Sequence, residues 1–306
     1  MELGMIGLGR MGANMAQRLH QAGITVTGFD PGEAARAQVS ETGIATVETL
    51  QALVQALPTP RVLWLMVPSK VVDATLEALL PLLAAQDVVI DGGNSWYRDS
   101  QRRAVLCGTH QVDFVDCGTS GGIWGLREGY CLMLGGDAAQ VQRLSPLFQA
   151  LAPAADRGWA HVGPVGAGHF SKMVHNGIEY GMMQAYAEGF ALMQKKAEFD
   201  LDLAQLAEVW RHGSVVRSWL LDLSADVLAQ NASLEGIAPY VEDSGEGRWT
   251  VSEAIELDVP APIITLSLLE RLRSRETNSF TDRLLAAMRN EFGGHAIKST
   301  GVQPGK

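Results

Sequence analysis

The sequence contains little of what disulfide-rich, membrane-spanning or nucleic-acid-binding proteins require. Only three cysteines occur among 306 residues, and none has the CxxC spacing of a metal site, a usage typical of a protein that stays reduced. The apolar runs end well before the length of about twenty residues that crosses a bilayer. A formal net charge of −10 disfavours nucleic acid as a partner. We therefore expect no metal, no membrane contact and no bound nucleic acid.

The composition is that of a globular protein, with 47% hydrophobic and 19% charged residues. A chain of this length has room for about two domains. The first residues enter an apolar strand pattern without a basic region and a cleavage site, so we expect a cytoplasmic protein.

A glycine-rich loop follows the first expected strand, residues 2–6, and precedes a helix-patterned run over 13–22. Glycines with GxGxxG spacing in that context permit a tight turn and a close approach of the backbone to a pyrophosphate, whose charge the helix N-terminus stabilises. The loop predicts a dinucleotide site. The residues expected to contact the cofactor here are Gly7, Leu8, Gly9, Arg10, Met11 and Gly12.

Asp30 ends the second expected strand, residues 24–29, eighteen residues after Gly12. A carboxylate at this place accepts hydrogen bonds from the free 2′-hydroxyl of an adenosine ribose and repels a 2′-phosphate. The predicted cofactor is therefore NAD, with NADP less favoured. The alternative is that Asp30 only stabilises the turn before Pro31 and Gly32.

Strand and helix patterns alternate through the first half, which predicts an α/β fold with a Rossmann-like, doubly wound parallel sheet. Ligands bind such sheets beyond the carboxyl ends of the strands. Three expected loops lie there, and we predict cofactor or substrate contacts from Val67, Pro68, Ser69, Asn94, Ser120, Gly121 and Gly122. The expected strands are 2–6, 24–29, 61–67, 87–91, 112–116 and 130–135.

The second half changes character and predicts an all-α domain. We place the dinucleotide-binding domain at 1–164 and an all-helical substrate and dimerisation domain at 165–306. The expected helices of this second domain are 166–195, 201–213, 215–230, 249–257, 261–273 and 280–291.

Within the first of these helices, Lys172, His175, Asn176 and Glu179 have the spacing of one helix face. The simpler alternative is a solvated amphipathic face. Apolar flanks and several glycines in the helix instead suggest a close approach by another segment. Burial and neighbouring cations would lower the pKa of a lysine towards neutrality, so Lys172 is a candidate base and Glu179 a candidate acid.

Three segments resemble the decarboxylating 6-phosphogluconate dehydrogenases: residues 91–95, the loop 118–133 and the helix segment 172–180. The resemblance extends from Gly7 to His295 and points to a short, NAD-preferring form. It implies oxidation of 6-phosphogluconate at C3, loss of C1 as carbon dioxide and formation of ribulose 5-phosphate, as in gluconate utilisation and the pentose phosphate pathway. Lys172 would take the C3 hydroxyl proton, and Glu179 would protonate C1 of the enediol that remains, giving ribulose 5-phosphate.

The same resemblance implies which residues bind the phosphorylated sugar acid. Asn94, which also lies at the cofactor, is one of them. The residues implied to hold the sugar acid are Asn94, Ser120, Gly121, Gly122, His175, Asn176 and Tyr180, and those implied to hold the phosphate end are Arg248, Arg271, Arg289 and His295.

Arg248 replaces the lysine that is familiar in the family, and a planar fork and a point charge are not equivalent phosphate ligands. Arg271 could instead belong to a solvated helix face. Arg289 and His295 have the six-residue spacing of a pair that the family contributes from a second subunit. We therefore expect a homo-oligomer, dimer or tetramer, with a shared active site; the alternative is an ordinary helix C-terminus.

Two other functions are compatible with parts of the sequence. A β-hydroxyacid dehydrogenase acting on a small 3-hydroxy acid would share the nucleotide fold, Lys172 and Asn176, but would need neither a C1 acid nor a phosphate clamp. A non-catalytic NAD sensor would have no use for Lys172 and Glu179 on one wall.

Overall fold

The computed structural model describes residues 1–293 and 296–298. The chain forms two compact units, the first made of Met1–Glu179 with Glu246–Asp258 and the second of Tyr180–Gly245 with Val259–Lys306. Within the described ranges, no helix combines the length and apolar character that crossing a bilayer requires. The domain division at residue 164 stays a prediction.

An eight-stranded sheet forms the centre of the first unit, in the order β3-β2-β1-β4-β5-β6-β7-β8. All neighbouring strands are parallel except β6 and β7, which are antiparallel. The strand order reverses between β1 and β4, so the loops after these strands flank the place where doubly wound sheets bind ligands. The strands are β1 (Glu2–Ile6), β2 (Thr25–Phe29), β3 (Ala45–Val47), β4 (Val62–Leu65), β5 (Val88–Asp91), β6 (Asp113–Ser120), β7 (Cys131–Gly135) and β8 (Trp159–Gly163).

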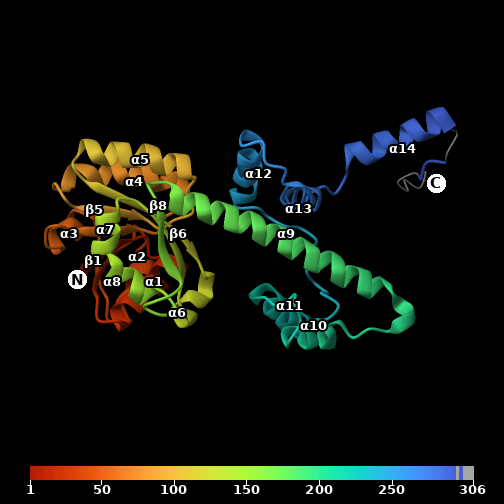
Figure 1. Cartoon of the computed structure of the whole chain (residues 1–306), viewed down its shortest axis with the longest axis horizontal. Coiled ribbons are helices and arrows are strands. Elements are labelled where there is room, and N and C mark those ends of the chain that lie inside the picture. Colours follow the sequence, from red (N-terminus) through yellow and green to blue (C-terminus); the bar gives the residue numbers. More distant parts are fainter. Residues whose placement is uncertain (294–295, 299–306) are drawn as a thin grey trace, which may run out of the picture. The chain divides into compact units, whose positions relative to one another are not determined.

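Helices cover both faces of the sheet (Figure 1). Buried residues of α1, α7 and α8 pack on one face, and those of α3, α4 and α5 on the other. These helices are α1 (Arg10–Gln21), α2 (Glu33–Ser40), α3 (Leu50–Ala56), α4 (Ser69–Leu79), α5 (Tyr97–Thr109), α6 (Gly125–Glu128), α7 (Ala138–Arg143) and α8 (Ser145–Leu151).

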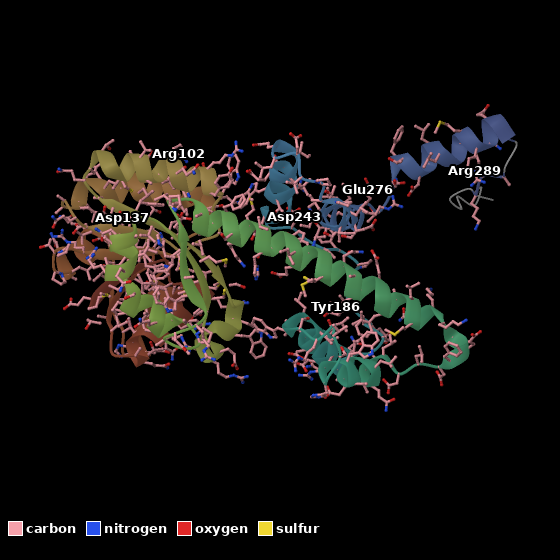
Figure 2. The ribbon with its side chains drawn as sticks, in the orientation of Figure 1. Arg102, Asp137, Tyr186, Asp243, Glu276 and Arg289 are labelled. Atoms are coloured by element: carbon pink, nitrogen blue, oxygen red, sulfur yellow. The ribbon has the colours of Figure 1, made fainter. Side chains whose placement is uncertain are left out.

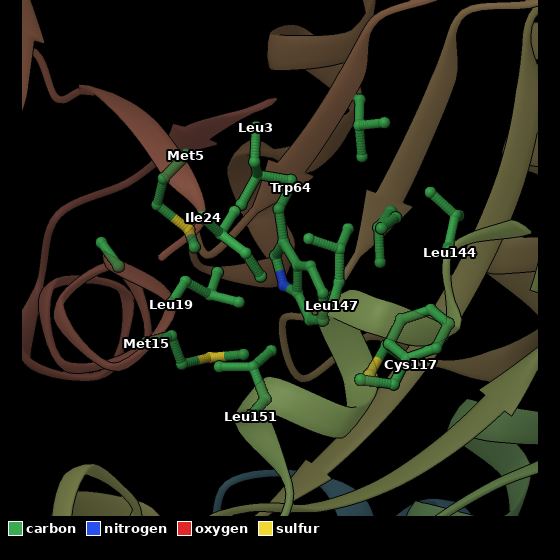
Figure 3. Packing of buried hydrophobic residues seen from close by; sticks show 14 of the residues in the cluster. Leu3, Met5, Met15, Leu19, Ile24, Trp64, Cys117, Leu144, Leu147 and Leu151 are labelled. Carbon is green, nitrogen blue, oxygen red and sulfur yellow. The ribbon is translucent and has the colours of Figure 1, made fainter. Parts of the chain in front are cut away.

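Trp64 of β4 lies at the centre of the first of these cores (Figure 3). Its ring is fully buried and meets Phe148 of α8 edge-on, with ring centroids 6.0 Å apart. Leu3 on the neighbouring strand and Leu147 of α8 complete the packing around it. The alternation of apolar strands and amphipathic helices thus produces the expected doubly wound fold.

The expected strands are confirmed, but the sequence missed β3 and β8 and the reversal at β7. The β3 strand has three residues, too few to display a periodic pattern. The β8 strand is largely exposed, so it lacks the apolar run that marks a buried strand. The connection from β6 to β7 contains only short helical turns, whereas a parallel pair needs a longer crossover.

The chain after residue 166 is helical, as expected. Phe190 and Leu221 belong to a small apolar core within the second unit. These helices are α9 (Ala167–Lys195), α10 (Leu203–Arg211), α11 (Trp219–Gln230), α12 (Glu246–Glu256), α13 (Pro262–Arg273) and α14 (Phe280–Gly293). Of these, α12 belongs to the first unit.

Candidate active site

The glycine loop after β1 has the tight geometry that its sequence predicts. Gly7 has φ +95°, and a Cβ at Gly7 would lie 2.6 Å from the Met66 carbonyl oxygen. A Cβ at Gly12 would lie 2.0 Å from the Gly7 carbonyl oxygen, whereas one at Gly9 would meet no described atom within 4 Å. Gly9 also begins α1 without a side-chain cap. The loop therefore leaves open space beside uncapped helix N–H groups, which fits a pyrophosphate.

Asp30 connects the glycine loop to the turn that follows β2. Its Oδ2 accepts a hydrogen bond from the Leu8 N–H at 2.8 Å, and its Oδ1 accepts one from the Gly32 N–H at 2.8 Å. Asp30 therefore does stabilise the turn before Gly32. It does not exclude contact with a ribose, because the two carboxylate oxygens together offer about four acceptor sites.

The loops after β1, β4 and β5 meet at the carboxyl edge of the sheet. A Cβ at Gly7 would lie 2.9 Å from the Val67 Cγ1 atom, and one at Gly93 would lie 2.9 Å from the Val67 carbonyl oxygen. Arg103, which is 1% exposed, donates to the Ser69 carbonyl oxygen at 3.3 Å and to Ser95 Oγ at 2.8 Å. The predicted cofactor segments are thus brought together.

Asp116 and two glycines fix the start of α9 against the sheet. The Asp116 carboxylate accepts from the Gly166 N–H at 2.6 Å and the His169 N–H at 2.8 Å. This satisfies N–H groups at the start of α9, which have no partner within the helix, and complements the helix dipole. A Cβ at Gly118 would lie 2.5 Å from both the Gly168 carbonyl oxygen and the Cβ of Lys172. The lysine is therefore held directly against β6.

The four polar residues of α9 lie together as their spacing predicts. His175 Nδ1 lies 3.0 Å from Asn176 Oδ1 and 3.9 Å from Glu179 Oε2. Burial lowers the pKa of the Lys172 ammonium below its ordinary 10.5, while Glu179, Glu246 and Cys131 act on that pKa in the opposite direction. The expectation of burial was right, but that of neighbouring cations was wrong: the charged groups acting on Lys172 are acids.

α12 covers the same stretch of α9. Thr250 Oγ1 donates to the Met173 carbonyl oxygen at 2.8 Å, and a Cβ at Gly177 would lie 2.7 Å from Thr250 Cγ2. The glycine in α9 therefore marks a close approach, as expected. Glu246 of α12, which sequence analysis did not single out, accepts from Asn94 and Asn176. The available signal was an acidic residue two positions before Arg248, a predicted phosphate ligand.

The loop after β6 begins at the end of the strand that packs on α9, and it then runs to α1, where the Ile123 carbonyl oxygen accepts from Asn14 Nδ2 at 3.4 Å. Ser120 pairs with Cys131 in the β6–β7 ladder, and Cys131 is one of the groups that act on Lys172. Gly121 has φ +131° and Gly122 has φ +52°, values that favour glycine. Ser120 therefore ends β6 beside Cys131, whereas Gly121 and Gly122 lie in the loop that follows.

Tyr180 and Arg271 belong to the second unit and lie against each other. The Arg271 guanidinium carbon lies 3.4 Å from the centroid of the Tyr180 ring, a cation–π contact. Arg271 Nη1 also donates to the Glu242 carbonyl oxygen at 3.1 Å. Arg271 is thus more than part of a solvated helix face, and its phosphate role stays a prediction.

The remaining predicted phosphate residues are distributed over two helices. Arg248 lies exposed on α12, two residues after Glu246. Arg289 projects from α14 and is exposed (Figure 2). His295 lies outside the described residues.

Two of the three cysteines, Cys107 and Cys117, are buried. Burial raises the pKa of both Cys107 and Cys117 to about 12, so their thiols stay protonated at neutral pH. Throughout residues 1–293 and 296–298, no group of three or more His, Cys, Asp or Glu side chains is arranged to hold a metal ion.

A nucleotide loop on a doubly wound sheet and a half-buried lysine packed against that sheet define a class, the NAD(P)-dependent dehydrogenases. The family is given by comparison with known proteins. Residues 2–163 match the NAD binding domain of 6-phosphogluconate dehydrogenase, and residues 168–290 match the C-terminal domain of the same enzyme. The chain belongs to the 6-phosphogluconate dehydrogenase family.

Curated relatives include a short and a long form. A NAD(+)-dependent, decarboxylating 6-phosphogluconate dehydrogenase of Haloferax volcanii is 44% identical over 299 residues, covering 97% of this chain and 98% of the relative. A decarboxylating 6-phosphogluconate dehydrogenase of Bacillus licheniformis is 35% identical, covering 94% of this chain but 65% of the relative. The chain therefore matches the length of the first and about two thirds of the second.

Solved structures agree with the fold. The 6-phosphogluconate dehydrogenase of Plasmodium falciparum superimposes with a TM-score of 0.82 at 27% identity, over 98% of this chain and 67% of that one. A 3-hydroxyisobutyrate dehydrogenase of Mycobacterium tuberculosis superimposes with a TM-score of 0.71 at 24% identity, over 87% of this chain and 90% of that one. The second likeness is one of fold alone.

Proposed function

We propose that the protein oxidises and decarboxylates 6-phosphogluconate to ribulose 5-phosphate and carbon dioxide with NAD as the hydride acceptor. The proposal rests on the position of Lys172 and Glu179, which lie on one stretch of α9 together with Asn176. Asn176 and Asn94 donate hydrogen bonds to the same carboxylate, that of Glu246. A candidate base, a candidate acid and two amide side chains therefore lie near the carboxyl end of the sheet, where we expect the nucleotide to bind.

Lys172 acts as the base. Its lowered pKa increases the fraction of neutral amine near physiological pH, and a neutral amine takes the proton of the C3 hydroxyl. The glycine loop would hold NAD, which would supply the acceptor for the hydride that leaves C3. The ammonium that Lys172 has become then stabilises the negative charge that develops on the C3 oxygen as C1 leaves as carbon dioxide.

Glu179 supplies the second proton. The enediol that remains after loss of carbon dioxide needs an acid at its own C1, the former C2 of 6-phosphogluconate, to become ribulose 5-phosphate. Glu179 is partly exposed and two helical turns from Lys172, so it can exchange protons with solvent between turnovers. We assign the sugar hydroxyls to His175, which lies near Asn176 and Glu179, and to Ser120.

The preference for NAD rests on Asp30. The carboxylate is anchored by two backbone N–H groups and is therefore a fixed negative charge beside the glycine loop. A fixed charge there repels a 2′-phosphate and accepts a hydrogen bond from a ribose hydroxyl. The NAD(+)-dependent relative from Haloferax volcanii supports the same preference.

The phosphate end is assigned to Arg248 and Arg271, with Arg289 and His295 contributed by a second subunit. An exposed apolar surface supports an oligomer: on α14, Phe280 is 69% and Leu285 50% exposed. Apolar side chains gathered on one helix are commonly covered by another chain.

The rival is a β-hydroxyacid dehydrogenase, and the two are separated by parallel assays. The purified protein is incubated with NAD and either 6-phosphogluconate or 3-hydroxyisobutyrate, and reduced cofactor is followed by absorbance. We expect turnover of 6-phosphogluconate only. Turnover of 3-hydroxyisobutyrate alone would replace the proposal by the rival function, and binding of NAD without turnover of either would favour a sensor.

A further inference from the structure

Glu246 is a buried carboxylate that joins two candidate ligand residues. It begins α12 and is 3% exposed. Its Oε1 accepts from Asn94 Nδ2 at 2.5 Å and from Asn176 Nδ2 at 2.7 Å. One oxygen atom thus links the loop after β5 to the polar face of α9, across 152 and 70 positions of the sequence.

The direction of these hydrogen bonds sets the orientation of both amides. An ionised carboxylate only accepts, so Asn94 and Asn176 must turn their NH₂ groups towards Glu246. Asn176 Oδ1 then faces His175 Nδ1, at 3.0 Å. Asn94, which is exposed, offers its carbonyl oxygen to a ligand. A sugar acid carries hydroxyl donors that such an oxygen binds.

Stability alone does not account for a carboxylate at this place. The second oxygen, Oε2, is buried without a hydrogen-bond partner among the described residues, which destabilises the fold. The attachment of α12 has other contacts, including the bond from Thr250 to the Met173 carbonyl oxygen and that from Tyr97 to Glu253 at 2.9 Å. A neutral residue at position 246 would leave those contacts in place.

Glu246 also acts on the candidate base. The ionisable groups that act on Lys172 are Glu179 from its own helix, Glu246 from α12 and Cys131 from β7. Each opposes the effect of burial. Removal of the charge at 246 therefore leaves burial less opposed and lowers the pKa of Lys172 further.

We propose that Glu246 is a positioning residue for the reaction: its carboxylate fixes which end of the Asn94 amide faces the substrate, holds the Asn176 amide with its oxygen towards His175, and places a negative charge near Lys172. The proposal rests on the function proposed above. It adds to that function a residue that neither touches the reacting atoms nor is needed to attach α12.

Three variants test it. Glu246→Gln keeps an acceptor oxygen and removes the charge. Glu246→Ala removes both. Glu253→Gln is the matched control, because Glu253 lies two turns further along the same helix and contacts Tyr97 and Arg98. For each variant, thermal unfolding, the pH profile of kcat/KM for 6-phosphogluconate, and the pH dependence of Lys172 modification by trinitrobenzenesulfonate are measured.

We expect Glu246→Ala to lower kcat/KM for 6-phosphogluconate by about 10- to 100-fold, the effect of losing hydrogen bonds to a charged group. Glu246→Gln should retain most of kcat/KM at its optimum, since Gln still accepts from the asparagines. In Glu246→Gln, the acid limb of the pH profile of kcat/KM should move to lower pH, and Lys172 modification should begin at lower pH. Glu253→Gln should behave as the parent does.

Two results would overturn the proposal. One is a folded Glu246→Ala protein with the kcat/KM of the control, and the other is a Glu246→Gln protein whose acid limb and modification profile coincide with those of the parent. If Glu246→Ala does not fold, the Gln variant decides. A parent protein that does not turn over 6-phosphogluconate refutes the proposed function instead, and the modification profile still tests the link between Glu246 and Lys172.

Discussion

Gly118 of β6 packs directly on Gly168 of α9, and neither glycine has room for a side chain. A Cβ at Gly118 would lie 2.5 Å from the Gly168 carbonyl oxygen, and one at Gly168 would lie 2.7 Å from the Asp116 carbonyl oxygen. Lys172 follows one turn later, so this contact determines the position of the candidate base relative to the sheet. Some glycines of α9 are therefore required for close packing, whereas others have room for a side chain.

Gly177 and Gly189, both in α9, should respond oppositely to replacement by alanine. Alanine gains about 1 kcal/mol over glycine in a helix. At Gly189 a Cβ would meet no described atom within 4 Å, so Gly189→Ala should stabilise by about that amount. At Gly177 the contact with Thr250 at 2.7 Å adds an overpacking cost of about 1–3 kcal/mol.

We therefore expect Gly177→Ala to be neutral or destabilising and to lower activity, since it displaces α12. Urea denaturation of both variants measures the difference. Equal stabilisation by the two substitutions would show that α12 does not pack closely on α9.

Cofactor preference should depend on Asp30. Replacing it by Asn and Pro31 by Arg removes the fixed carboxylate and supplies a cation for a 2′-phosphate. The ratio of kcat/KM for NADP to that for NAD should rise by about tenfold or more, equivalent to roughly 1.4 kcal/mol. Pro31→Arg alone serves as the control, because it retains the carboxylate. An unchanged ratio in the double variant would contradict the assignment.

Lys172→Met should abolish oxidation and stabilise the fold at neutral pH. Because burial holds the pKa of Lys172 below 10.5 in the folded state, the unfolded chain binds more protons between the two pKa values. The buried charge therefore destabilises the protein below the folded pKa, and this effect disappears as pH rises towards 10.5.

The stabilising effect of Lys172→Met should accordingly be largest at pH 7 and shrink at higher pH. Urea denaturation at pH 7 and at a higher pH measures the change in the free energy of unfolding. Lys195→Met is the control, because Lys195 is an exposed residue of the same helix. In the parent, kcat/KM should fall as pH drops and Lys172 becomes protonated. A Lys172→Met protein that still reduces NAD would exclude the lysine as the base.

Glu179→Ala should impair the protonation of C1 more than hydride transfer. The hydrogen at C1 of ribulose 5-phosphate exchanges with solvent through the same enediol, so exchange in deuterated water isolates this step. We expect exchange to slow by about 10²- to 10⁴-fold, the usual contribution of a positioned acid. Exchange at the parent rate would assign the proton to another group.

A shared active site predicts complementation between two inactive proteins. Lys172→Ala and His295→Ala oligomers should each be nearly inactive. After co-refolding, a mixed pair contains one site with an intact Lys172 from one chain and an intact His295 from the other, so activity should return. If His295 serves its own chain, no mixed pair holds an intact site and the mixture stays inactive.

The sequence predicted the elements whose signals are local. The glycine loop, the strand before it and the face of α9 are each contained within about twenty residues, and their spacing follows from helix and strand geometry. The exposed edge strand β8 and the short β3 have no such local signal. The antiparallel β7 depends on a connection too short for a parallel crossover.

Contacts between segments far apart in the sequence could not be predicted from local sequence patterns. The bond between Asn94 and Glu246 spans 152 positions, and nothing in either segment alone reveals it. For the same reason the acidic surroundings of Lys172 were not foreseen. The contact of Arg271 with Tyr180 likewise needed the fold, since several arginines near position 271 had equivalent spacing.

The most direct measurement of the proposed reaction follows the fate of C1. The protein is supplied with NAD and 6-phosphogluconate that carries ¹³C at C1, and labelled carbon dioxide and reduced cofactor are measured together. The account predicts that one labelled carbon dioxide appears for each NAD reduced, with ribulose 5-phosphate as the other product. Reduction of NAD with the label retained in a sugar acid would contradict it.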